Sequence, residues 1–186
     1  ELPGKKDGSY SRGTKQNKPP ADSSTGKADF FPTPKTLAGI MAHFARITHG
    51  DTVLEPSAGN GSLADAARNA GGKVTCIELS SDRAEECRKK GYNTTCGNFL
   101  EIEPSELFDA VLMNPPFKQG RDVKHIRHAV KFLNPGGTLV ALCAAGPRQR
   151  AAFEDVDGWT WKTLPPGQFK SEGTNVEVAM VIFRNE

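Results

Sequence analysis

Apolar residues in this chain fall into short runs that alternate with stretches of helical periodicity. Runs with the length and composition of buried strands occupy residues 52–54, 73–79, 108–113 and 138–143. Apolar residues recur at every third or fourth position, as in amphipathic helices, over residues 62–70, 81–90 and 121–133. Strands that alternate with helices in this way predict an α/β fold, in which a mostly parallel central sheet carries helices on both faces.

The pattern also predicts elements at the two ends of this fold. A helix should begin near residue 34, because Thr33 is a favourable N-cap and Pro34 a favourable first helical residue. Residues 92–96 are predicted to form a short third strand. Residues 159–164 and 176–183 alternate as strands do and predict a closing hairpin at the sheet edge, with a surface loop over residues 165–174.

Composition sets the size and class of the protein. The 186 residues, 37% of them hydrophobic, are enough for one α/β domain, which we place at residues 29–186 without a separate target-recognition domain. Residues 1–28 are basic and poor in large apolar side chains, so we expect a flexible tail. No run is long enough for a membrane span, and the four cysteines lack metal-site spacing. We therefore expect a cytoplasmic protein with no membrane contact and no metal.

The first candidate site is the tetrapeptide Asn114-Pro115-Pro116-Phe117. It directly follows the strand-like run 108–113, so it should lie at the carboxyl end of a strand, where ligands collect in open α/β sheets. The Asn114 side-chain oxygen and a carbonyl of the Pro-Pro unit can each accept an N–H, while Phe117 offers a face for stacking. This composition suits a planar amino group. A strand that ends in a proline turn beside a core phenylalanine is the plainer interpretation.

The second candidate site is the turn after the strand-like run 52–54. Its sequence, Glu55-Pro56-Ser57-Ala58-Gly59-Asn60-Gly61, lacks the third glycine of a dinucleotide fingerprint. A carboxylate beside the glycines would repel a pyrophosphate but suits a ligand with an ammonium group and no phosphate. S-adenosylmethionine is such a ligand.

Further cofactor candidates follow along the chain. Glu78 ends the next strand about 20 residues after the turn, the spacing at which a carboxylate meets ribose hydroxyls. Asn98 is a candidate for the adenine edge and Phe99 for packing on its ring, although a turn residue and a core phenylalanine would explain both equally well. The segment Phe31-Pro32-Thr33-Pro34 either closes over a cofactor or only caps a helix.

A cationic ridge follows the tetrapeptide. Positive side chains share the side of the predicted helix opposite its apolar positions, with Lys118 just ahead of it: Arg121, Lys124, Arg127 or His128, and Lys131. Arg148 and Arg150 add charge further along. Such a ridge can follow a phosphate backbone, whereas the alternative is an ordinary solvated helix face.

Together, the motifs 53–61, 77–78, 108–117 and 132–137 resemble those of class I S-adenosylmethionine-dependent methyltransferases. Within that class the chain is most similar to short phage- and plasmid-type DNA adenine-N6 methyltransferases with an Asn-Pro-Pro-Phe motif. The resemblance runs from about residue 30 to residue 184. It implies a Rossmann-like sheet with an antiparallel last strand, and a bacterial or phage-infected cell as the setting. Asn98 stands where the family commonly has an aspartate.

The resemblance implies methyl transfer to an exocyclic base amine, with DNA as the favoured partner and a protein partner for target recognition as an option. Protein-glutamine or RNA amino methylation, or a non-catalytic binding subunit, are the alternatives. The catalytic residues would be Asn114, Pro115, Pro116 and Phe117. The cofactor would contact Phe31, Thr33, Pro34, Glu55, Pro56, Ser57, Ala58, Gly59, Glu78, Leu79, Asn98, Phe99 and Asn114. The substrate would contact Phe117, Lys118, Arg121, Lys124, Arg127, Arg148 and Phe169, which matches the aromatic that flanks the target base in the family.

Overall fold

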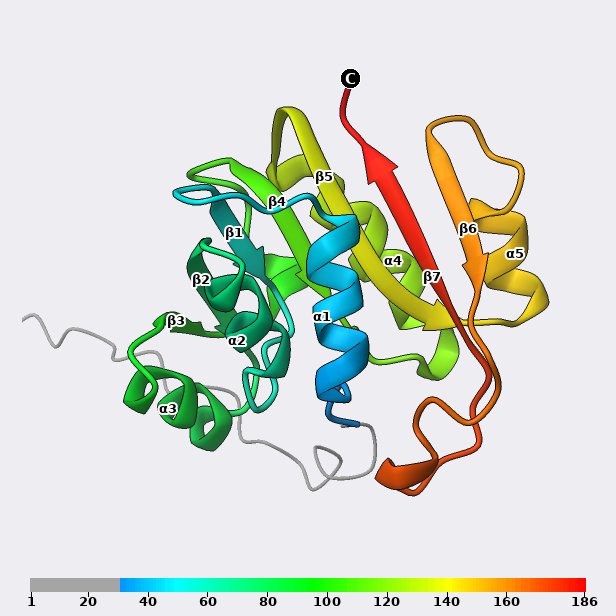
Figure 1. Ribbon diagram of the computed structural model, residues 1–186, viewed down its shortest axis with the longest axis horizontal. Helices are drawn as coiled ribbons and strands as arrows, with labels where there is room; N and C mark the ends of the chain where they lie inside the picture. The colour runs from blue at the N-terminus through cyan, green and yellow to red at the C-terminus, as the bar shows by residue number, and fades with distance from the viewer. Residues whose placement is uncertain (1–30) are drawn as a thin grey trace, which may run out of the picture.

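The structure is a computed structural model that describes residues 31–186 (Figure 1). The predicted tail, residues 1–28, lies outside the described residues. The α-helices are α1 (Lys35–Phe44), α2 (Ser62–Asn69), α3 (Ser81–Lys89), α4 (Arg121–Ala129) and α5 (Pro147–Phe153). The strands are β1 (Thr52–Glu55), β2 (Lys73–Glu78), β3 (Asn93–Cys96), β4 (Phe108–Met113), β5 (Leu133–Ala144), β6 (Trp159–Thr163) and β7 (Val178–Arg184).

The strands form one sheet in the order β3-β2-β1-β4-β5-β7-β6. Neighbours from β3 to β5 pair in parallel, and β7 runs antiparallel to both β5 and β6. This confirms the predicted Rossmann-like fold with an antiparallel last strand. The two final strands pair as the predicted hairpin, but β7 inserts between β5 and β6, so β6 forms the edge.

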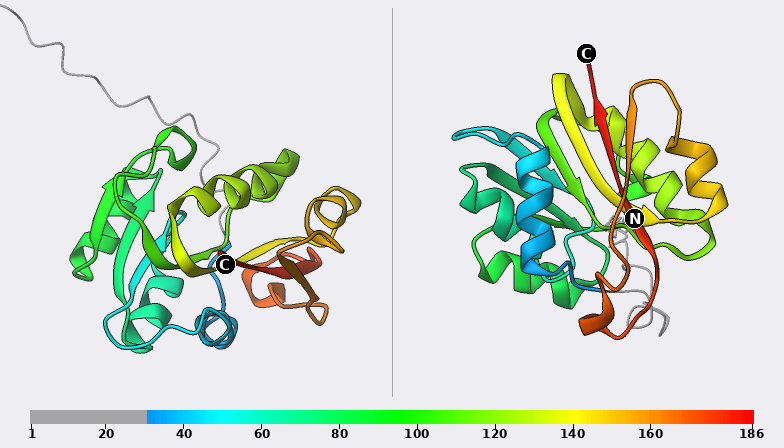
Figure 2. Two further views of the ribbon diagram at one scale, coloured as in Figure 1. Left: turned by 90° about the horizontal axis from the view of Figure 1, so that it is seen from above. Right: turned by 45° about the vertical axis from the view of Figure 1, so that its right-hand side comes forward.

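Helices cover both faces of the sheet, as Figure 2 shows from above. On one face, Leu37 and Met41 of α1 and Leu63 of α2 pack on alternate strand residues such as Val53 and Leu112. On the other face, Ile126 of α4 and Phe153 of α5 pack on the residues between them, including Leu54, Val111 and Met113. The central strands are therefore buried on both sides, which explains why they appear in the sequence as continuous apolar runs.

Asp109 ties the three central strands together at their amino-terminal edge. Its Oδ2 accepts hydrogen bonds from the Thr52 backbone N–H at 2.8 Å and the Thr52 hydroxyl at 2.9 Å, at the start of β1. Its Oδ1 accepts from the side-chain amide of Asn134 in β5 at 2.9 Å. These bonds hold the pKa of Asp109 below its usual value.

The predicted turn at residues 134–137 is a break in the β4–β5 register. Pairing moves from Phe108 opposite Leu133 to Ala110 opposite Thr138. Gly137 lies close to the backbone of both strands, since a Cβ there would lie 2.9 Å from the Asn134 carbonyl oxygen in β5 and 3.1 Å from that of Phe108 in β4. Only glycine fits this approach.

Within residues 31–186, none of the helices has the length and apolar character needed to cross a bilayer.

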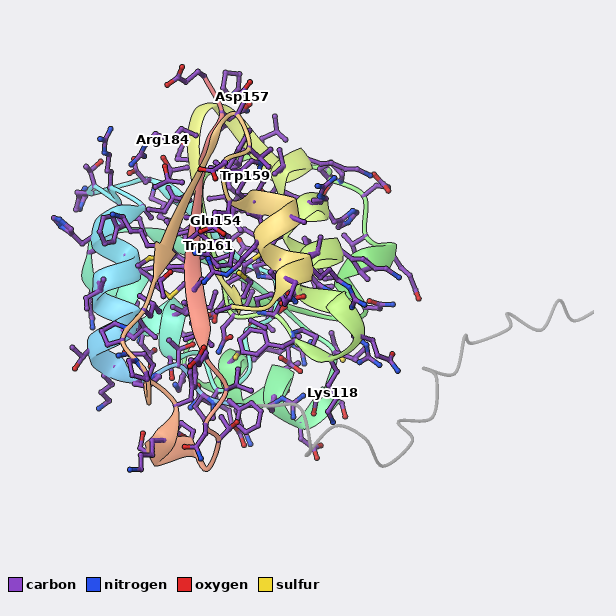
Figure 3. All side chains as sticks on the ribbon, turned by 90° about the vertical axis from the view of Figure 1, so that its right-hand side faces the viewer. Lys118, Glu154, Asp157, Trp159, Trp161 and Arg184 are labelled. Atoms are coloured by element: carbon purple, nitrogen blue, oxygen red, sulfur yellow. The ribbon has the colours of Figure 1, made fainter. Side chains whose placement is uncertain are left out.

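We expect Asp109→Asn to lower the free energy of unfolding by about 1–3 kcal/mol at pH 7, because a single amide oxygen cannot serve both sets of donors. The folded-state pKa of Asp109 is depressed, so this stabilisation is present above the unfolded value of about 3.9 and is lost as pH falls through the folded pKa. Urea unfolding at several pH values would test this. Asp157→Asn, in the exposed loop before β6 (Figure 3), is the matched control, and equal losses in the two variants would contradict the assignment.

Candidate active site

The candidate residues converge at the carboxyl ends of β1, β2 and β4. The chain crosses from β1 to β2 on one side and later places β4 on the other side of β1, so a topological switch point lies between β1 and β4. In Figure 1 this edge faces downward, together with the start of α1 and the connection between β6 and β7.

The glycine turn after β1 is held by side chains from other elements. Gly59 and Gly61 have φ values of 54° and 79°, a conformation that glycine adopts without steric cost. The Glu78 Oε2 accepts from the Gly59 N–H at 2.7 Å, and the Lys90 ammonium donates to the Asn60 carbonyl at 2.6 Å. The turn is thus fixed in shape before any ligand binds.

Glu78 has a structural task in addition to the ribose role that the spacing predicts. Its Oε1 accepts from the Ser80 N–H at 2.8 Å and from two nitrogens of Arg83, at 2.9 and 3.1 Å. With the Gly59 bond, four protein donors occupy the carboxylate, which has about four lone-pair sites. The structure therefore shows Glu78 as the clamp of the glycine turn, and contact with a ribose stays a prediction.

Glu55 is a buried carboxylate at the end of β1. Its Oε2 accepts from the Ala64 N–H in the first turn of α2 at 2.7 Å, and only 2% of the residue is exposed. Burial raises the pKa of Glu55 well above its usual value, against the opposing effect of the Ala64 bond, and the nearby acids Glu78 and Asp65 raise it further. No cation pairs with Glu55 among residues 31–186. A cationic ligand would relieve this cost.

A small cavity, open to solvent, lies beside Glu55. Its lining comes from the segment before α1, the glycine turn and the end of β4: Phe31, Pro32, Thr33, Glu55, Ser57, Ala58, Asn60, Ser62 and Asn114. Six of these nine residues were predicted as cofactor contacts. Asn60 and Ser62 were missed as site residues, although Asn60 Oδ1 accepts from the Ser62 hydroxyl at 2.7 Å and so shapes the wall of the cavity.

Asn114 closes the cavity with its side-chain amide in a defined orientation. Its Nδ2 donates to the Phe31 carbonyl at 3.0 Å and to the Thr33 hydroxyl at 3.1 Å. Both amide protons are thereby used, so the acceptor oxygen Oδ1 points away from these partners. The prediction that Thr33 caps α1 is wrong: the N-cap is Pro34 with no side-chain cap bond, because the Thr33 hydroxyl is turned towards Asn114 instead.

The two aromatic residues expected near cofactor and target base are core residues here. Phe99 is 3% exposed and packs against His128 and Phe132, and its packing on the cofactor ring stays a prediction. Phe169 is 1% exposed, in the same core cluster as Val178 and, at its margin, Phe117, so it presents no face to a base. For Phe99 this is the core alternative that the sequence left open.

The remaining predicted contacts lie around this centre. The Asn98 side chain accepts from the Leu100 N–H at 3.2 Å and donates to Glu101 at 2.8 Å, which caps the short 3₁₀ helix Phe99–Glu101. Leu79, immediately after β2, is 64% exposed, unusual for an apolar residue at a strand end. Pro115 is buried, whereas Pro116 and Phe117 are half-buried.

The cationic ridge, defined as Lys118, Arg121, Lys124, Arg127 and Lys131, is exposed along α4 and its two flanks. Lys118 lies at the lower edge of the molecule in Figure 3. His128 does not belong to it, because its Nε2 lies 2.9 Å from the Ile102 carbonyl and its ring packs on Phe99. Lys131 is partly neutralised by Glu103 at 3.5 Å. Arg121, Lys124 and Arg127 make up its central part.

Arg148 joins the start of this ridge, but Arg150 does not. A Cβ on Gly120 would lie 2.6 Å from a guanidinium nitrogen of Arg148, so the absence of a side chain lets Arg148 lie across the start of α4. Arg150 instead pairs with Glu154 at 2.7 Å and stacks over Trp161.

Sequence reasoning missed the fully buried Asp122. Its carboxylate accepts hydrogen bonds from the Gln149 side chain of α5 at 2.8 Å and from the Ala144 N–H of β5 at 3.0 Å. Asp122 therefore fixes α5 and β5 to α4.

Comparison with known sequences identifies the family. Residues 38–156 match the methyltransferase small domain, which covers more than half of the chain and includes the glycine turn, β4 and Asn114. The chain belongs to this family. This family agrees with the S-adenosylmethionine-dependent methyltransferase motifs found in the sequence.

Part of the chain is similar to named relatives. It is 33% identical over 120 residues to tRNA1(Val) (adenine(37)-N6)-methyltransferases of two Shewanella baltica strains, OS185 and OS195. The match covers 57% of this chain and 50% of each relative, so the chain spans about half the length of the curated relatives it matches.

Solved structures share the fold at low sequence identity. The methyltransferase subunit of a type I restriction-modification system from Streptococcus thermophilus has a TM-score of 0.72 at 19% identity, over 84% of this chain and 44% of that one. A putative RNA methyltransferase from Pyrococcus horikoshii has a TM-score of 0.65 at 22% identity, over 83% and 87%. These similarities establish the architecture.

The residues of the cavity fit S-adenosylmethionine. Glu55 is a buried carboxylate for the methionine ammonium, and the glycine turn lets a ligand approach the backbone. Outside the cavity lining, exposed Leu79 after β2 offers apolar surface for an adenine. The bound cofactor supplies an electrophilic methyl group. The individual contacts are predictions.

We expect Glu55→Gln to stabilise the ligand-free methyltransferase at neutral pH and to weaken cofactor binding. Glutamine keeps an oxygen for the Ala64 N–H but carries no buried charge. Because the folded pKa of Glu55 is raised, the wild-type penalty begins above the unfolded value of about 4.3 and grows until the folded pKa is reached, by about 1.4 kcal/mol per pH unit. Thermal unfolding from pH 4 to 8 would measure this.

Titration with S-adenosylhomocysteine would measure the accompanying loss of affinity. The exposed Glu106→Gln is the matched control. A Glu55→Gln variant that binds cofactor as tightly as wild type would remove Glu55 from the ammonium site.

Proposed function

We propose that this methyltransferase transfers the methyl group of S-adenosylmethionine to the exocyclic N6 amine of adenine in a nucleic acid. The observation that carries the proposal is the oriented amide of Asn114. Its NH2 group is tied to Phe31 and Thr33, so its Oδ1 remains as an acceptor at the end of β4. An acceptor fixed at this edge is what an amino group needs as a partner.

The chemistry follows from the weak nucleophilicity of an aryl amine, whose lone pair is delocalised into the ring. The Asn114 Oδ1 and the Pro115 carbonyl would each accept one N–H of the target amine. Both bonds strengthen as positive charge develops on the nitrogen, so they favour the transition state over the ground state. S-adenosylmethionine would supply the methyl group as an electrophile and leave as S-adenosylhomocysteine, and the methylated amine would lose one proton to solvent.

Base recognition requires access to that amine. A base stacked in a duplex cannot reach the carboxyl edge of the sheet, so the target adenine must be flipped out or already unpaired. Half-buried Phe117 supplies a stacking surface next to Asn114. Phe169 would contribute only if the connection between β6 and β7 opened.

Two observations support a nucleic-acid substrate. The relatives that match over 120 residues are named adenine-N6 methyltransferases of tRNA, whereas the tetrapeptide resembles that of DNA adenine methyltransferases. Both resemblances agree on the adenine N6 amine and differ in the polymer. The cationic ridge starts next to the tetrapeptide, where a phosphate backbone would pass.

The deciding experiment is methyl transfer from labelled S-adenosylmethionine to DNA, tRNA and protein in parallel, followed by digestion to the modified unit. We expect N6-methyladenine as the product, and the polymer that carries it shows whether DNA or RNA is the substrate. Label found only in protein, or on a base other than adenine, would overturn the proposal.

Asn114→Ala should lower the transfer rate by about 10²–10³-fold, the typical loss when one oriented electrostatic group is removed from the reacting centre. Affinity for S-adenosylhomocysteine should stay within a few-fold, since Asn114 is assigned to the acceptor. Single-turnover transfer and calorimetry would measure the two quantities. Asn69→Ala, at the exposed end of α2, is the control, and parallel losses of rate and affinity would refute this division.

Lys124→Glu combined with Arg127→Glu should weaken nucleic-acid binding about equally for unrelated sequences. The salt dependence of binding should also flatten by about two released counterions, because each cation that leaves a phosphate contact removes about one. The control, Arg46→Glu with Lys73→Glu, makes the same charge change at exposed positions on the amino-terminal edge. If both double variants change the affinity for nucleic acid and its salt dependence by the same amount, the ridge is an ordinary solvated helix face.

A further inference from the structure

The segment before α1 contacts two parts of the site at once. Phe31 and Thr33 line the cavity assigned to the cofactor, and the same two residues accept the amide protons of Asn114. No other side-chain hydrogen bond recorded among residues 31–186 joins this segment to β4 or to the loop that follows it.

The chemistry of the two acceptors determines which end of the Asn114 amide faces the substrate. The Phe31 carbonyl has no proton, so it can pair only with the NH2 end of the amide. The Thr33 hydroxyl can accept from NH2, but it could also donate to Oδ1 if the amide turned over. Phe31 therefore selects the orientation, and Thr33 holds the NH2 group in place from a second direction.

The Thr33 hydroxyl bonds to Asn114 and not to the first turn of α1. The residue is 6% exposed, and α1 begins without any side-chain cap bond. A threonine at the N-cap would ordinarily bond to a backbone N–H of the first helical turn, but Pro34 takes that position here. Here its lone pairs serve Asn114, and its own proton is left for a group in the cavity.

We propose that Thr33 is a positioning residue that couples cofactor binding to acceptor binding. A cofactor that fills the cavity packs against residues 31–33 and restricts their movement, which keeps the Asn114 Oδ1 aimed at the target amine. By thermodynamic reciprocity, an acceptor held on Asn114 then raises the affinity for cofactor by the same factor. This inference rests on the proposed role of Asn114 but not on which polymer carries the acceptor.

The test compares Thr33→Val, which keeps the shape but removes the hydroxyl, with Thr33→Ser, which keeps the hydroxyl. We expect Thr33→Val to lower kcat by roughly tenfold, the worth of one hydrogen bond lost in the transition state, and to raise KM for the nucleic acid by about the coupling factor that is lost. Thr33→Ser should recover most of that loss. Thr36→Val, exposed in the first turn of α1, is the matched control and should behave as wild type.

Binding provides a readout that does not depend on turnover. An adenine-containing oligonucleotide of the polymer that wild type methylates is titrated with and without saturating S-adenosylhomocysteine. We expect S-adenosylhomocysteine to raise the affinity for the oligonucleotide by about fivefold or more in wild type and in Thr33→Ser. Fivefold is the lower end of typical coupling factors between two sites. In Thr33→Val the factor should approach one. If Thr33→Val does not fold, Thr33→Ala replaces it.

The outcomes separate this inference from the proposed function. Wild type that methylates adenine, together with Thr33→Val that matches it in kcat and in coupling, overturns the positioning role alone. Thr33→Ser that loses as much as Thr33→Val also overturns it, because the hydroxyl is then not the cause. If wild type methylates a different acceptor, the proposed function fails, and the same variants compared on that acceptor still decide the role of Thr33.

Discussion

The site depends on one interaction, the pair of hydrogen bonds that the Asn114 amide donates to the segment before α1. These bonds join residues more than 80 positions apart in the chain and connect the carboxyl end of β4 to the wall of the cofactor cavity. An isolated asparagine at a strand end would rotate freely between orientations. With both protons used, the side chain becomes an oriented acceptor, and the reaction requires that preorganisation because water would otherwise compete for the amine.

Buried carboxylates shape the rest of the cavity, and they have different partners. Glu78 meets four donors from three residues, so its charge is well compensated and it holds the glycine turn. Glu55 has one recorded backbone donor and no cation among residues 31–186, and burial raises its pKa. The contrast assigns the two acids different tasks: one keeps the architecture in place, and the other carries an unfavourable charge that a cationic ligand can relieve.

Outside the cavity, positive charge is concentrated along α4. The cationic ridge along α4 begins where β4 delivers the tetrapeptide, and the buried Asp122 anchors α4 to β5 and α5. The surface that would follow a phosphate backbone is thus rigidly connected to the centre that would hold the base. The cationic ridge can therefore attract a phosphate backbone over a long range, while Asn114 selects an amine of the same substrate at short range.

The sequence alone determined the fold class, the approximate bounds of the strands along the chain, the cofactor, and the two loops at the strand ends. It could do so because continuous apolar runs, glycine turns and the Asn-Pro-Pro-Phe tetrapeptide are local patterns. Only the tertiary structure decided how individual polar and aromatic side chains are used. Thr33 resembles a helix cap but serves Asn114, Glu78 clamps a turn, and Phe99 and Phe169 pack in the core. Local sequence records what a side chain is able to do, whereas the partner it takes is decided by residues that folding brings beside it from far along the chain.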